Sequence, residues 1–149
     1  MADVIVYDKA KYHYEGDFPN GLAIKYAFVH TGMFLGWIVD HDLFSEEFEE
    51  DSMNEIEKFK QRALTGTQIY EMWDGVLSED MLSDEGMESA NVYFDFEKGM
   101  FLHDYEATFP GKESLYFVED TWENYFKMKE VIDQRYHEWR LVKVAKDQI

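Results

Sequence analysis

The sequence predicts a helix-rich α+β fold, with residues 1–149 forming a single globular domain that contains a small sheet of short strands. Apolar residues recur at intervals of three and four in several segments, which is typical of helices packed on a core. Short alternating segments between turn residues indicate only a few strands. Aromatic residues make up 17% of the 149 residues. Disordered acidic chains lack such aromatic content, so we expect this chain to fold.

The N-terminal third is predicted to contain a strand, a turn and a long helix. Val4 and Val6 alternate as in a strand, and the pattern extends to Tyr12 and Tyr14. Residues 15–21 are rich in turn formers. The following helix should run from Leu22 to about His41, because its apolar residues lie three and four apart; these residues are Tyr26, Val29, Met33, Phe34, Trp37 and Ile38.

The rest of the chain is predicted to alternate helices with two short strands. Residues 52–55 have the form of a capping box and should begin a helix. A short helix over residues 67–73 should end at Asp74-Gly75, and Ser83 or Asp84 should begin a helix that continues through Phe94. Residues 100–102 and 115–118 are predicted to be strands. Asp120 or Thr121 should cap a last long helix that reaches Trp139.

Negative charge is concentrated in two segments that contain no Lys or Arg. The formal net charge is −18, from 32 acidic and 14 basic residues. Residues 26–57 and 63–97 each hold nine acidic residues, and the remainder of the chain is balanced. Such a field attracts cationic partners and repels nucleic acid and anionic membranes. We therefore expect a basic protein partner, with no nucleic-acid or membrane binding.

The acidic segments contain the residues expected to bind this partner. We predict that the two segments form one continuous face, with exposed aromatic residues as apolar anchors. The alternative is a solvated face that only increases solubility. The predicted partner-binding residues are Phe44, Glu46, Glu47, Phe48, Glu49, Glu50, Asp51, Trp73, Asp84 and Glu85.

Histidine and aspartate residues provide the alternative to a binding surface. His13, Asp17 and His30 could be brought together by the loop that joins the first strand to the long helix. We expect them to form a structural polar network without a metal or other cofactor, because their spacing matches no recognised metal motif. The competing hypothesis is a metal-dependent enzyme or metal-binding regulator that uses these three residues, with His103 as a further ligand.

The sequence also indicates the cellular compartment. The chain has no Cys, so it has no disulfide framework or thiolate site. Met1 is not followed by the basic and apolar segments of a signal peptide. The most apolar segment, residues 33–39, is far shorter than the roughly 20 residues that span a bilayer. We expect a cytoplasmic protein.

Four segments together resemble a family of small bacterial cytoplasmic proteins of unknown function. They are residues 12–19 (YHYEGDFP), 30–37 (HTGMFLGW), 103–105 (HDY) and 118–124 (VEDTWEN). The resemblance places Asp104 and Asp120 beside His13, Asp17 and His30 in the shared polar set. Members of the family often lie near genes for delivered toxins, which implies that they are immunity proteins.

The resemblance and the charge together predict a protein that is not an enzyme. We expect an acidic immunity protein that binds a basic, nucleic-acid-targeting toxin domain and covers its active surface. The alternatives are the metal-dependent protein described above and an acidic adaptor for another basic partner. The sequence leaves the oligomeric state open.

Overall fold

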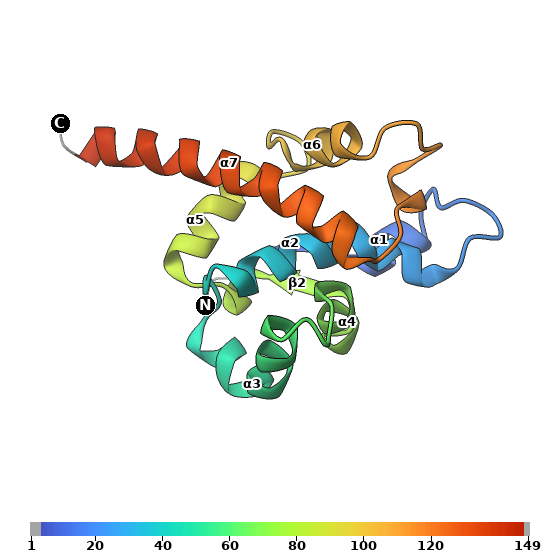
Figure 1. Cartoon of the computed structure of the whole chain (residues 1–149), viewed down its shortest axis with the longest axis horizontal. Helices are drawn as coiled ribbons and strands as arrows, with labels where there is room; N and C mark the ends of the chain where they lie inside the picture. The colour runs from blue at the N-terminus through green and yellow to red at the C-terminus, as the bar shows by residue number, and fades with distance from the viewer. Residues whose placement is uncertain (1–3, 148–149) are drawn as a thin grey trace.

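The computed structural model describes residues 4–147 as helices packed around one central helix, with a two-stranded sheet (Figure 1). The strands are β1 (Val6–Lys9) and β2 (Val76–Ser78). The helices are α1 (Ala10–Tyr14), α2 (Val29–Asp40), α3 (Glu46–Lys60), α4 (Gly66–Met72), α5 (Asp84–Tyr93), α6 (Phe101–Thr108) and α7 (Trp122–Asp147). Short 3₁₀ helices are η1 (Ile24–Phe28), η2 (Glu79–Met81) and η3 (Leu115–Phe117). The predicted helix-rich α+β class is confirmed.

Helix α2 is the centre of the fold. Every residue from Val29 to Val39 is buried, as expected for a helix that is apolar on all sides. Helices α3, α4 and α7 contact it, and α7 crosses the molecule beside it before extending past the other elements (Figure 1). The predicted buried helix is therefore confirmed, although its first part, η1, is a 3₁₀ helix.

One predicted helix start and two predicted strands are wrong. Helix α3 begins at Glu46, where the Ser45 side chain accepts a hydrogen bond from the backbone N–H of Phe48. The predicted start near Ser52 is instead a kink inside α3, where φ is −130° and ψ is 25°. Residues 101–108 form α6 and residues 115–117 form η3, so neither predicted strand exists. Short apolar segments do not distinguish strand from helix, because both bury them.

Several helix ends are confirmed. Helix α4 ends at Met72, and the chain turns at Asp74 and Gly75 with φ of 59° and 66°. Ser83 caps α5 by accepting a hydrogen bond from Gly86 N–H. Thr121 Oγ1 accepts one from Asn124 N–H before α7. Among the described residues, no helix is both long and apolar enough to cross a membrane.

The sheet positions the start of the chain against α2. Strand β1 pairs antiparallel with β2, a strand that the sequence did not predict, and Asp8 lies opposite Leu77. The register shifts between Val6 and Asp8. A register shift changes the direction of the side chains that follow it, as a β-bulge does, and Asp8 is buried with 3% exposure. Helix α1 follows directly, so Tyr12 and Tyr14 are helical rather than part of the strand.

Candidate functional site

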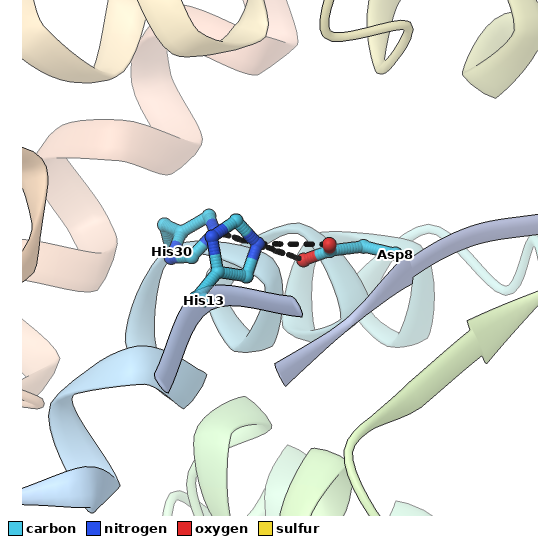
Figure 2. A group of neighbouring side chains, drawn as sticks. All are labelled: Asp8, His13 and His30. Carbon is cyan, nitrogen blue, oxygen red and sulfur yellow. Dashed lines mark hydrogen bonds and ion pairs between the residues drawn. The ribbon is translucent and has the colours of Figure 1, made fainter. Parts of the chain in front are cut away.

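Three potential metal ligands converge beside the first turn of α2. Asp8 comes from β1, His13 from α1 and His30 from α2 (Figure 2). One ligand atom from each side chain lies within 4.8 Å of the other two. Within the described part of the chain, no other group of three or more His or acidic residues meets this criterion.

His13 lies between the other two side chains. Its Nε2 is 2.8 Å and 3.0 Å from the two carboxylate oxygens of Asp8, and 3.3 Å from Nε2 of His30 (Figure 2). Its Nδ1 is 2.7 Å from the hydroxyl oxygen of Tyr116 in η3. Thr31, the neighbour of His30 on α2, donates from Oγ1 to Asp8 Oδ2 at 2.6 Å. Hydrogen bonds to Thr31 and Tyr116 therefore fix the orientations of Asp8 and His13.

Burial keeps His30 neutral. Its side chain is fully buried, and the ring packs edge-on against Tyr105 and Tyr116. Loss of hydration lowers the pKa of His30 to about 3, which the nearby Asp8 charge only partly opposes. A neutral imidazole has one lone pair available to a cation. His30 Nδ1 is buried without a hydrogen-bond partner among the described residues, so the ring is not held as part of a complete hydrogen-bond network.

Only part of the predicted polar network is brought together. His13 and His30 meet, as predicted, but Asp8 takes the position expected for Asp17. Asp17 is exposed at the edge of the site. Its charge acts there on Tyr116: burial raises the pKa of the Tyr116 hydroxyl, and the charges of Asp8 and Asp17 raise it further. Asp8 could not be recognised from the sequence, because its inward direction depends on the β1–β2 register.

The other two predicted members lie elsewhere. Asp104 is buried under α7, where it accepts two 2.9 Å hydrogen bonds from Arg135 and one from Tyr93. Asp120 is exposed and accepts a hydrogen bond from Thr65 Oγ1 at 2.8 Å. Both have structural partners away from the Asp8–His13–His30 cluster.

The predicted partner-binding residues fall into exposed and unexposed groups. Residues Glu46, Glu47, Glu49, Glu50, Asp51 and Asp84 are exposed. Phe48 is 1% exposed and Phe44 is half-buried, so neither is the free anchor that the sequence predicted. Trp73 is also half-buried, with its indole N–H donating to Ser52 Oγ at 2.9 Å. Glu85 contacts α7, where Tyr136 donates a hydrogen bond to it.

The beginnings of α3 and α5 lie side by side. An antiparallel bridge pairs Phe44 with Leu82, the residues just before the two N-caps. Two backbone hydrogen bonds join the same two segments. Ser45 N–H donates to the Met81 carbonyl at 3.0 Å, and Ser83 N–H donates to the Leu43 carbonyl at 2.8 Å. The two acidic segments therefore meet at these helix starts.

Bases from outside the acidic segments neutralise part of their charge. Arg62 pairs with Asp40 at 3.1 Å, Lys60 pairs with Asp42, and Lys143 of α7 pairs with Glu88. The segments contain no basic residue in sequence but have basic neighbours in space. Among the described residues, the exposed acids of the first two turns of α3 make no ion pair within 4.0 Å.

Comparison with known proteins places the chain in a family. The family model described as a domain of unknown function, DUF7832, matches residues 6–118. Since the match covers most of the chain, the protein belongs to this family. Asp8, His13, His30, Thr31 and Tyr116 all lie within the matched region. No curated protein and no solved structure matches the chain.

Proposed function

We propose that this protein binds a divalent transition-metal ion through Asp8, His13 and His30. The observation that carries the proposal is the separation of the three ligand atoms. His13 Nε2 lies 3.0 Å from Asp8 Oδ2 and 3.3 Å from His30 Nε2. His30 Nε2 lies 3.6 Å from Asp8 Oδ2. In the plane of these three atoms, the point equidistant from them lies about 1.9 Å from each, and equidistant points just outside the plane lie at the ~2.0–2.2 Å of zinc–nitrogen and zinc–oxygen bonds.

Hydrogen bonding alone leaves the cluster incompletely satisfied. His13 Nε2 carries either one hydrogen or one lone pair. If His13 Nε2 carries a hydrogen, this single hydrogen has to be shared between the Asp8 carboxylate and His30 Nε2. With a lone pair, it faces the lone pairs of the Asp8 carboxylate at 2.8 Å. A cation between the three atoms accepts a lone pair from each of them at once.

The surrounding residues resemble the usual support of metal ligands. The second nitrogen of a metal-bound His commonly donates to an oxygen, and this fixes which nitrogen faces the metal. Tyr116 provides such an oxygen for His13 Nδ1–H, and Thr31 orients the Asp8 carboxylate. Two imidazoles and one carboxylate favour zinc, iron or similar ions over magnesium and calcium, which prefer oxygen ligands.

Protein purified without chelator should retain about one equivalent of a transition metal, measured by elemental mass spectrometry. After chelator treatment, calorimetric titration with Zn²⁺ should show one site, and bound Zn²⁺ should raise the unfolding temperature because only the folded state assembles the site. Mg²⁺ at the same concentration is the control. The absence of a saturable Zn²⁺ heat and of any thermal shift would rule the site out.

We also propose, as a second function, that the exposed acids at the start of α3 bind a basic protein. This surface is favoured by the adjacent start of α5 and because, within residues 4–147, no base forms an ion pair with the acids of residues 46–51. With Phe48 buried, Met53, which is 65% exposed on the same helix, is available as the apolar contact. The specific form of this proposal is an immunity protein that covers the active surface of a basic toxin domain, as the family resemblance implies.

Electrostatic attraction should dominate the association rate with such a toxin domain. Replacing Glu46, Glu47, Glu49, Glu50 and Asp51 with Gln or Asn should slow association, since charge at the rim mainly affects on-rates. Raising the salt concentration should have the same effect, because the screening length shrinks from about 10 Å at 0.1 M to about 3 Å at 1 M. Immobilised-partner kinetics would measure both. A rate that responds to neither change would contradict the proposal.

A further inference from the structure

We propose that the groove between α5 and the C-terminal half of α7 binds a small amphipathic carboxylate, a ligand with an apolar body and one anionic group. This groove has a volume of about 760 Å³. Ligand sites of small molecules are mostly apolar clefts of roughly 300–1,000 Å³ that contain a few polar groups. The groove lies apart from the metal cluster, and this proposal does not depend on the metal proposal.

The groove is built from aromatic and aliphatic side chains. Phe34, Trp37 and Ile132 line it from the core, where each is about 1% exposed. Val92 of α5, Met100 before α6 and Val142 of α7 line it further out, with exposures of 59%, 39% and 55%. Exposed apolar side chains that gather in one place, rather than singly, are characteristic of binding sites.

Arg135 gives the groove a fixed donor for an anion. Its Nε and Nη2 each donate to Asp104 at 2.9 Å, and Asp104 is 5% exposed and also accepts from Tyr93. This support holds the guanidinium in the groove wall, where the side chain is 38% exposed. Arg has five N–H donors. In the described part of the chain, the one ion-pair contact of Nη1 is with Glu138 at 4.0 Å, so donors remain for a ligand carboxylate.

The charged side chains that line the groove carry a net positive charge, whereas the whole chain is negative; they are the bases Lys98, Arg135, Lys143 and Lys146 and the acids Glu88 and Glu138. Lys98 and Lys146 line the groove and, among the described residues, make no ion pair within 4.0 Å. The chain as a whole carries −18. Because the long-range field repels anions, an anionic ligand must be held by these close contacts together with burial of its apolar body. A carboxylate can accept from the donors left on Arg135, Lys98 and Lys146, whereas an ammonium group would have to share Glu88 with Lys143 and Glu138 with Arg135.

Octanoate and 1-octanol provide matched probes with the same chain length and different head groups. Titration should be followed by calorimetry and by the fluorescence of Trp37 and Trp139, both of which line the groove. We expect saturable binding of octanoate at one site. Octanoate should bind at least about 10-fold more tightly than 1-octanol, the effect of one charge-assisted hydrogen bond. Equal affinity for the two probes, or no saturable octanoate binding, would overturn the proposal.

Substitutions test whether octanoate binds in the groove. Val142→Glu should abolish octanoate binding and, since Val142 is 55% exposed, should leave the protein folded. Lys98→Glu should weaken binding several-fold, whereas Lys112→Glu, at an exposed base away from the groove, should not. Unchanged affinity in both groove variants would place the ligand elsewhere. A dimer in sedimentation that Val142→Glu converts to a monomer would show that a second copy covers the groove, and would also overturn the proposal.

Discussion

Replacing Asp8 with Asn should lower the affinity of the protein for Zn²⁺ by at least about 100-fold, because a neutral amide oxygen is a much weaker ligand than a carboxylate. The change should preserve the local structure. The Asn side-chain oxygen can still accept from Thr31, and its NH₂ group can donate to His13. His13→Gln should have an effect of similar size. Calorimetric titration of chelator-treated protein measures both affinities.

His103→Gln is the matched control for these two variants. His103 is exposed on α6 and lies outside the cluster, so this variant should bind Zn²⁺ like the unmodified protein. Thr31→Val and Tyr116→Phe should give smaller losses of about 10- to 100-fold, because they remove groups that orient the ligands rather than the ligands themselves. If Asp8→Asn and His13→Gln both retained full affinity, the metal would bind elsewhere and the cluster would be a structural network.

The central helix and the capped helix starts could be predicted because their signals are local. The apolar pattern around Phe34 and Trp37 and the N-cap residues Ser83 and Thr121 act within one or two helical turns. The start of α3 was misplaced because two capping sequences, at Ser45 and Ser52, compete there. Strand β2 was missed because only three residues form it, and its pairing with β1 joins segments almost 70 positions apart.

Two of the three candidate ligands could be predicted from the sequence. His13 and His30 were expected to meet because a short connection joins their segments. Asp8 and Tyr116 required tertiary information: Asp8 is buried next to the register shift in β1, and η3 brings Tyr116 back to the N-terminal segment from 103 positions away. The ion pairs that neutralise part of the acidic segments could not be predicted for the same reason. Lys143, for example, reaches Glu88 only through the packing of α7 on α5.

The largest expected loss of stability comes from Gly66→Ala at the contact of α2 with α4. A Cβ atom on Gly66 would lie 2.2 Å from the backbone oxygen of Gly32, and 2.8 and 2.9 Å from the backbone N and Cα of Gly36. Gly32 and Gly36 are four residues apart and therefore share one face of α2. Because all three atoms belong to the backbone, no side-chain rotation can relieve the overlap.

Helices α2 and α4 would have to move apart to accept the methyl group. At an unconstrained helical position, Gly→Ala stabilises a protein by about 0.5–1 kcal/mol. Here we expect the free energy of unfolding to fall by about 3 kcal/mol, at the upper end of the usual cost of overpacking. At roughly 2–4 °C per kcal/mol for a chain of this size, the unfolding temperature should drop by about 6–12 °C. Thermal and denaturant unfolding measure these changes.

Asn54→Ala, at an exposed position in α3, is the control and should change the stability by less than about 1 kcal/mol. The Gly66 variant also tests the link between the helix contact and the Asp8–His13–His30 cluster. His30 and Thr31 directly precede Gly32, so a shift of α2 at this contact should also displace the ligands and weaken Zn²⁺ binding. Normal stability with unchanged Zn²⁺ affinity would mean that α4 can move without disturbing α2, and that the close contact does not set the geometry of the site.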